Sequence, residues 1–236
     1  MLKITDYGFL FQSMNGGKAS GLFGKSSSPF GTFQLSQLNS SAVQSQLRAA
    51  GIDTNSNQYK AVIKKMMNAA NGSTAMYTNV NAIKNLMSRY DKDGDYIDPV
   101  TGLAGLLVTE ENIAGKNRII NIPESSREEM FELTKREFLR ENGVCNGDTT
   151  KRSDVYTNMY RKMKKEDRLA AGHTLGQYER AYRQAFIDAV RSADPNWQVG
   201  MPIKAGVLDN ITREDVERSL VQNGSKLERR TVDYSV

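Results

Sequence analysis

The segment TLGQYERAYRQAFIDAV, residues 174–190, carries the clearest structural pattern in the chain. Its aromatic and aliphatic residues recur at intervals of four: Tyr178, Tyr182, Phe186 and Val190. That spacing places these side chains on one face of an α-helix. Thr174 precedes the run as an N-cap, and Pro195 follows it as a stop. The segment therefore predicts an amphipathic helix between Thr174 and Pro195.

Similar patterns extend outward from this helix along most of the chain. Further helices are predicted over residues 34–50, 57–70, 76–90, 125–141, 153–171 and 212–223. The run SSREE at residues 125–129 contains two overlapping capping boxes, which mark the start of a helix. Gly172 is expected to end the helix over 153–171, and this would place His173 in a loop between two helices.

Two regions depart from the helical pattern. Residues 103–108 and 118–122 are short apolar runs bounded by Gly and Pro, which predict a small β-hairpin or a pair of strands. Residues 197–203 alternate between apolar and other residues, but Gly200 and Pro202 limit them to an extended arm lying over helices. The predicted fold class is mainly α, with small β additions and a loose N-terminal arm. The expected parts are an arm over 1–33, one helical domain over 34–225 and a C-terminal tail over 226–236.

The composition excludes several classes of protein. One cysteine among 236 residues excludes a disulfide framework, and a single histidine leaves little material for a zinc site. No apolar run reaches the 18 residues that would suggest a membrane-spanning helix. The net charge of +5 is thinly spread, so nucleic acid is not an expected partner. The N-terminus does not read as a secretory signal, so the default expectation is a cytoplasmic protein, with leaderless export as the alternative.

Residues 1–33 hold five of the eight phenylalanines together with many glycines and serines. Exposed aromatic side chains are adhesive, so the segment is interpreted as a flexible arm that makes contacts. The arm would dock on its own domain, on a partner protein or on a second copy of the chain. The residues expected to make these contacts are Tyr7, Phe9, Phe11 and Phe23.

The strongest chemical pattern is the acidic run DKDGDYID at residues 91–98. Calcium takes six to eight oxygen ligands, and carboxylates at alternate positions of a tight loop can converge on such an ion. The run resembles an EF-hand calcium loop over about eight residues, but it lacks the glycine after the third acidic position and the glutamate at the twelfth. The run predicts a calcium site with a dissociation constant of about 10⁻⁴–10⁻³ M. Its expected ligands are Asp91, Asp93, Asp95 and Asp98.

Three other patterns have simpler explanations. Residues 19–26 imitate a phosphate-binding P-loop, but neither a strand before them nor a helix after them is predicted, so nucleotide binding is rejected. The basic residues within 151–168 fit a solvated helix face as well as a nucleic-acid surface. A catalytic pair of Cys145 and His173 has no local support, because neither residue stands in a nucleophile motif. No catalytic residue is assigned.

Several stretches together resemble a family of uncharacterised clostridial proteins: Lys3–Met14, Gly51–Ala61, Asp91–Gly102 and Asp209–Val221. The resemblance implies a bacterial source and no known activity. The residues themselves predict a non-enzymatic binding or structural protein, with the calcium loop as a structural element. The alternatives are a hydrolase that uses carboxylates alone, which needs two well-placed acids in a cleft, and a helical nucleic-acid-binding protein.

Overall fold

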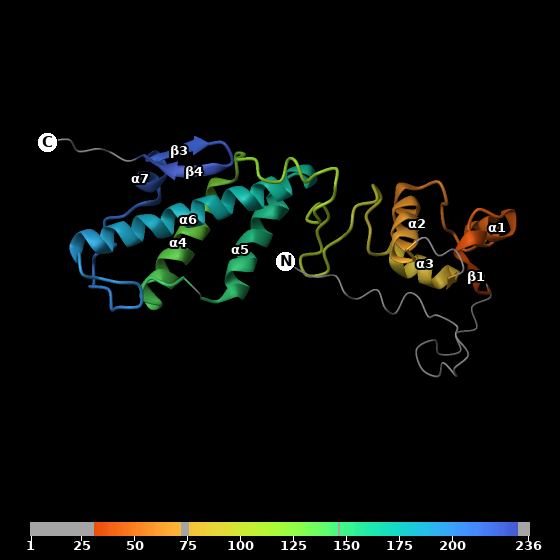
Figure 1. The fold of residues 1–236 in the computed structure, drawn as a ribbon, viewed down its shortest axis with the longest axis horizontal. Helices are drawn as coiled ribbons and strands as arrows, with labels where there is room; N and C mark the ends of the chain where they lie inside the picture. The colour runs from red at the N-terminus through yellow and green to blue at the C-terminus, as the bar shows by residue number, and fades with distance from the viewer. Residues whose placement is uncertain (1–30, 72–75, 146, 231–236) are drawn as a thin grey trace. The chain divides into compact units, whose positions relative to one another are not determined.

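The computed structural model describes residues 31–71, 76–145 and 147–230 (Figure 1). Within these residues the chain forms seven α-helices and two pairs of antiparallel strands, which confirms the predicted mainly α fold. The predicted N-terminal arm lies outside the described residues, except for residues 31–33. No helix in the described ranges is long and apolar enough to cross a membrane.

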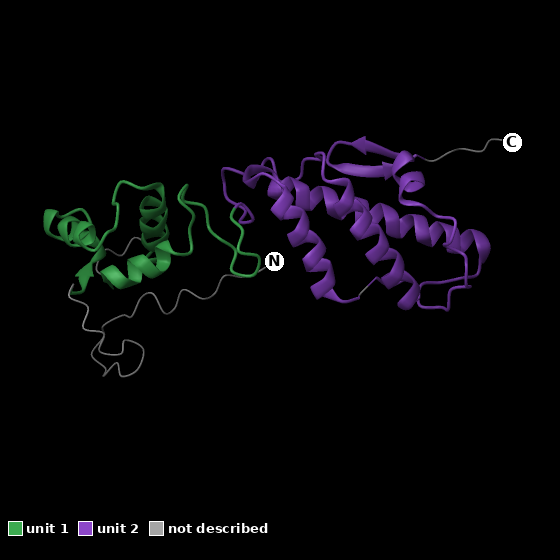
Figure 2. Ribbon diagram, turned by 180° about the vertical axis from the view of Figure 1, so that it is seen from behind, with its two compact units in different colours: residues 1–104 green, residues 105–236 purple. Residues whose placement is uncertain are grey.

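The chain divides into two compact units, residues 1–104 and 105–236 (Figure 2). The sequence predicted one helical domain over 34–225. In the structure, by contrast, the buried apolar side chains form two separate clusters, one from residues 33–90 and one from residues 122–216. We refer to residues 1–104 as unit 1 and to residues 105–236 as unit 2.

Unit 1 packs three short helices, α1 (Ser41–Ala49), α2 (Asn57–Ala69) and α3 (Val80–Met87). Each begins at a polar N-cap whose side chain accepts a backbone N–H bond: Ser40, Ser56 and Asn79. A 3-10 turn, Leu35–Gln37, precedes α1. Strands β1 (Phe33–Gln34) and β2 (Tyr77–Thr78) pair beside the helices. Phe33 is buried in this core, so the phenylalanine that ends the predicted arm belongs to the folded unit.

Unit 2 contains three longer helices, α4 (Glu124–Arg140), α5 (Thr149–Lys162) and α6 (Arg168–Ala193). A 3-10 turn, η2 (Lys165–Asp167), connects α5 to α6. The four residues that recur at intervals of four, beginning with Tyr178, lie in α6. Three of them, Tyr182, Phe186 and Val190, are buried in the core of the unit. Tyr182 and Phe186 each pack edge-on against Phe131 of α4.

The predicted break at Gly172 is wrong. The break occurs at Met163, whose backbone is extended, and α6 runs without interruption from Arg168 through Gly172 and His173. Gly172 serves close packing, because a Cβ atom there would collide with the hydroxyl of Tyr160 on α5. A larger residue at this position would force Tyr160 to shift, so glycine suits the close contact between the two helices, and His173 lies on a helix and not in a loop.

The C-terminal end of unit 2 also differs from the prediction. Helix α7 (Arg213–Arg218) is short, and β3 (Leu220–Asn223) and β4 (Lys226–Arg229) form a hairpin where a helix end and a tail were expected. Gly224 in the turn has a positive φ of 58°, a conformation that glycine adopts readily. The predicted tail is wrong for residues 226–229.

The strands predicted over 103–108 and 118–122 do not form. Ala104 makes one isolated bridge with Ile97, and residues 118–122 have no regular secondary structure. Residues 197–203, expected as an extended arm, contain a turn at residues 199–200, and the buried indole N–H of Trp197 donates to the carbonyl of Met201 beside it. Buried apolar side chains in these runs pack against the rest of the protein, and this burial does not require the backbone to pair as β-strands.

Candidate functional site

The most prominent feature of unit 2 outside its core is a groove between α6 and β4. It is a cavity of about 780 Å³, within the range of ligand-binding pockets. Its walls come from one face of the helix and from the strand beside it. The lining residues on α6 are Gln177, Arg180, Ala181, Gln184 and Asp188. Those on and just after β4 are Lys226, Leu227, Glu228, Arg229 and Arg230.

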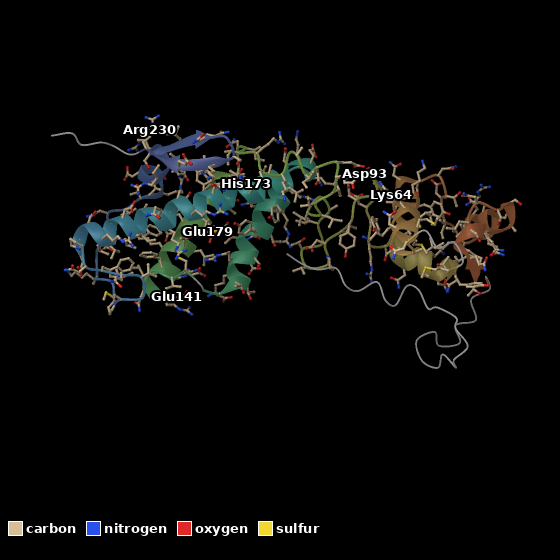
Figure 3. All side chains as sticks on the ribbon, in the orientation of Figure 1. Lys64, Asp93, Glu141, His173, Glu179 and Arg230 are labelled. Atoms are coloured by element: carbon tan, nitrogen blue, oxygen red, sulfur yellow. The ribbon has the colours of Figure 1, made fainter. Side chains whose placement is uncertain are left out.

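Two polar contacts fasten the hairpin to α6, one on each side of the groove. His173 Nε2 donates to the carbonyl of Ser225 in the hairpin turn at 2.6 Å. Fifteen residues along the helix, Asp188 Oδ2 accepts from Arg229 Nη1 at 2.5 Å. Figure 3 shows His173 near the turn and Arg230 at the far end of the hairpin. The groove lies between these two contacts, so its walls are held at both ends.

Gln177 is the unusual residue of the groove. The residue as a whole is only 5% exposed, it lines the cavity, and its side chain makes no hydrogen bond to the described residues. Its amide atoms are not among the fully buried polar atoms without a partner, so the amide is open to the groove. Ser126 and Thr134 do have fully buried hydroxyls without partners, but they line neither this groove nor the second cavity near Arg127.

The groove has a positive character. Four basic and two acidic side chains line it, for a net charge of +2. Both acids are already engaged, because Asp188 accepts from Gln184 and Arg229, and Glu228 accepts from the Asn223 amide. The side chains of Arg180, Lys226 and Arg230 have no ion-pair partner in the part of the chain that the structure describes.

The acidic loop predicted to bind calcium follows α3 in unit 1, and its aspartates play different parts. Asp91 Oδ1 accepts from the backbone N–H groups of Asp93 and Asp95, at 3.0 Å and 2.9 Å. Asp98 Oδ2 accepts from both the backbone N–H and the hydroxyl of Thr101, at 2.8 Å and 2.7 Å. Two of the four predicted ligands therefore close local turns through one oxygen each.

The four aspartates are not brought together as a metal site. No group of three or more histidine, cysteine, aspartate or glutamate side chains within the described ranges could hold a metal ion. The loop is instead closed by backbone bonds such as Asp91 N–H to the Asp95 carbonyl at 2.9 Å, and by the pairing of Tyr90 with Tyr96. Calcium binding stays a prediction of the sequence.

A carboxylate pair that a hydrolase could use occurs at Glu137 and Glu179, but the pair is bridged. Arg152 contacts Glu137 Oε2 at 2.6 Å and Glu179 Oε1 at 3.2 Å, so one guanidinium lies between the two acids. Neither acid lines the groove or the cavity near Arg127. Burial raises the pKa of the neighbouring Tyr156, and the Glu179 carboxylate raises it further. The cluster joins α4, α5 and α6, which is a structural role.

Cys145 and His173, the pair rejected from the sequence, have separate partners. The Cys145 thiol donates to the carbonyl of Thr134 at 3.7 Å, while His173 contacts the hairpin turn. Burial raises the pKa of the Cys145 thiol to about 11, which leaves it protonated at neutral pH. A thiol in this state is a poor nucleophile.

A second charged cluster centres on Arg213, the first residue of α7, which is only 5% exposed. Its guanidinium contacts Glu217 on α7 at 2.9 Å and Glu128 on α4 at 2.6 Å. Glu217 also accepts from Arg127 and from the Tyr182 hydroxyl. Burial would lower the pKa of Arg213, but the surrounding carboxylates raise it more, so the arginine stays charged. The cluster fastens α7 to α4 and α6.

The remaining sequence-based candidates divide into two groups. The predicted contact residues Tyr7, Phe9, Phe11 and Phe23 lie outside the described residues. The basic stretch 151–168 is split between α5, an extended Met163 and η2, so it does not form the single helix face that was considered for nucleic acid. The groove could not be expected from the sequence, because the residues of its β4 wall were predicted to be a tail and nothing in the sequence pairs that strand with α6.

The chain was also compared with known proteins. The model of a family described as a domain of unknown function, DUF3879, matches residues 52–236. No curated protein matches the chain, and no solved structure does. The match includes α2, α3 and the whole of unit 2, so both walls of the groove lie inside the family domain. The chain belongs to this family.

Proposed function

We propose that this member of the DUF3879 family acts by binding, and that the groove between α6 and β4 binds an anionic partner. The observation that carries the proposal is the charge of the groove: Arg180, Lys226 and Arg230 line it without an ion-pair partner among the described residues, whereas both of its acids are engaged. An anionic group bound there would supply the partner that these cations lack.

The charge of the groove supports an anionic partner. Asp188 and Glu228 are both occupied by contacts within unit 2, whereas three cations around the groove are not. A groove lined by charge of one sign raises the local concentration of ligands of the opposite sign and speeds their association. The partner would therefore meet Arg180 on the helix side and Lys226 and Arg230 on the strand side.

A binding function is better supported than the alternative of a hydrolase that uses carboxylates. The carboxylates Glu137 and Glu179 are both held by Arg152, so neither is placed opposite an open cleft. The groove itself contains two carboxylates, and each accepts hydrogen bonds from neighbouring side chains. For general acid and base chemistry these two carboxylates would have to exchange those hydrogen bonds for contacts with a substrate.

The experiment is a fluorescence-anisotropy titration of the full chain with labelled heptaglutamate and heptalysine peptides. We expect the acidic peptide to bind, with an affinity that falls as salt rises, and the basic peptide not to bind. Arg180→Glu should abolish most of the binding. Arg191→Glu is the matched control, because Arg191 is exposed near the end of the same helix and does not line the groove. Equal loss in both variants, or no binding of the acidic peptide, would contradict the proposal.

A further inference from the structure

The hairpin presents one unpaired backbone edge to the groove. Arg230 N–H donates to the Ser219 carbonyl at 2.9 Å, so residue 230 faces β3. The register pairs Leu227 with Gln222 and Arg229 with Leu220. In an antiparallel ladder, hydrogen-bonded and non-hydrogen-bonded pairs alternate. The N–H and C=O groups of Leu227 and Arg229 therefore point away from β3.

These outward backbone groups have no hydrogen-bond partner within the residues that the structure describes. Leu227 and Arg229 both line the groove, so the unpaired edge of β4 forms part of its wall. An unpaired strand edge is a template for an additional strand, because it offers donors and acceptors at a regular spacing. The contacts of His173 and Asp188 with the hairpin hold this edge in place beside α6.

The side chains around the edge are arranged for a ligand that has acidic groups on both faces. Arg229 contacts Asp188 on α6, so the face of β4 that carries Arg229 and Leu227 is turned towards the helix. Lys226 and Arg230 alternate with these residues and lie on the opposite face. Arg180 belongs to the helix floor. A strand added to β4 would therefore pass between cations on its two sides.

We infer that the groove takes an acidic peptide in extended conformation, which adds to β4 as a third strand of the β3–β4 sheet. The inference rests on the proposed function and names its ligand class. Backbone hydrogen bonds to Leu227 and Arg229 supply affinity, and Arg180, Lys226 and Arg230 select acidic side chains. The Gln177 amide, which can both donate and accept, contacts the peptide from the floor of the groove.

A peptide fits this edge better than a nucleic acid does. The edge offers carbonyl acceptors as well as N–H donors, and a phosphate group can only accept hydrogen bonds. A phosphate beside the Leu227 and Arg229 carbonyls would leave them unpaired and would face their negative ends. An extended peptide has its own N–H groups to donate, so it satisfies both kinds of backbone group at once.

The test uses the full chain and labelled heptaglutamate, blocked at both ends, which carries acidic side chains on both faces of an extended strand. The same peptide N-methylated at every residue has the same charge but no backbone N–H. We expect N-methylation to weaken binding at least tenfold, which is about the effect of losing one or two net hydrogen bonds. Because this change is made in the peptide, it does not depend on how a protein variant folds.

Two proline variants identify the edge. Leu227→Pro removes an N–H that points into the groove, while Gln222→Pro removes the equivalent N–H of the paired residue on the outer edge of β3. Neither change removes a hydrogen bond of the β3–β4 ladder. We expect Leu227→Pro to weaken binding of heptaglutamate about tenfold and Gln222→Pro to leave the affinity unchanged.

The outcomes separate this inference from the proposed function. Equal binding of the normal and the N-methylated peptide would overturn strand addition and leave an anion-binding groove. Loss of binding in Gln222→Pro alone would place the peptide on β3 and overturn the inference. Tighter binding of a single-stranded oligonucleotide than of the peptide would also overturn it. If no acidic probe binds, the inference and the proposed function both fail.

Discussion

Among the described residues, Thr78 is the buried polar side chain of unit 1, whereas unit 2 buries six: Ser126, Thr134, Glu137, Thr174, Gln177 and Arg213. Unit 1 holds its short helices with an apolar core and with capping side chains at the surface. Unit 2 uses charged contacts to connect α4, α5, α6 and α7. Both units therefore have an apolar core, and unit 2 adds charged contacts between its helices.

The contrast also locates the candidate site. Polar groups of the acidic loop in unit 1 are bonded to the backbone of the loop itself, as Asp91 and Asp98 show. In unit 2, Glu137 and Arg213 are paired with charges on other helices. Gln177 has no such partner and lines a cavity, which separates it from the residues that only stabilise the fold. Buried polar residues become informative once their partners are known.

The largest expected effect is on unit 2, through Arg213. Arg213→Met removes the buried cation that Glu128 and the partly buried Glu217 share, and we expect a loss of about 3–5 kcal/mol in the free energy of unfolding. Trp197, the single tryptophan, is buried in unit 2, so its fluorescence during urea unfolding reports on that unit. The exposed Arg191→Met is the control. If Arg213→Met lowers the free energy of unfolding by less than about 1 kcal/mol, the charged cluster does not contribute substantially to the stability of unit 2.

A comparable change in unit 1 tests its apolar core. Leu47 is fully buried in that core, and Leu47→Ala should cost about 2–4 kcal/mol through the cavity that it leaves. Because Leu47 packs against residues of unit 1, we expect the far-UV circular dichroism transition to change while the Trp197 transition stays the same. A shift of the Trp197 midpoint by the same amount would show that the two units unfold as one.

The acidic loop gives a smaller effect that separates structure from calcium. Asp91→Ala removes the acceptor of two backbone N–H groups, and we expect a loss of about 1–2 kcal/mol in thermal melts with a chelator present. The loss of stability in Asp91→Ala is compared with that in Asp93→Ala, measured by thermal melts in the same buffer. If Asp91→Ala costs stability only when millimolar calcium is present, the calcium prediction from the sequence gains support over the local role.

The smallest effect concerns the pH dependence of unit 2 through Cys145. The thiol pKa is raised from 9.0 to about 11 by burial, so the folded chain keeps its proton while the unfolded chain loses it. The contribution of the thiol to stability is present below pH 9 and is lost between about pH 9 and pH 11. Cys145→Ser should show a shallower loss of stability over this range in urea melts followed by Trp197. Identical slopes in both proteins would contradict the shift.

The sequence predicted the helices best where a regular pattern and a cap coincide. The period of four in residues 174–190 lies within α6, and the helices predicted to begin at residues 57 and 212 correspond to α2 and α7, which begin at Asn57 and Arg213. The sequence-based prediction was wrong at Gly172. A glycine that ends a helix cannot be distinguished in the sequence from a glycine that makes room for a tyrosine of a neighbouring helix. The prediction was also wrong at residues 220–229, where a short hairpin has too few residues for its alternation to be recognised.

The candidate sites divide in the same way. The acidic run at 91–98 could be found from residue types alone, and the roles of Asp91 and Asp98 follow from turns that are local in the chain. The groove could not be found, since Gln177 and Leu227 are 50 residues apart and share a wall only after the hairpin lies along α6. Capping and helical periodicity act between neighbours, so the sequence determined the mainly α character of this protein. Burial, ion pairing and an unpaired strand edge depend on contacts between distant residues, so the tertiary structure alone decided where the groove forms.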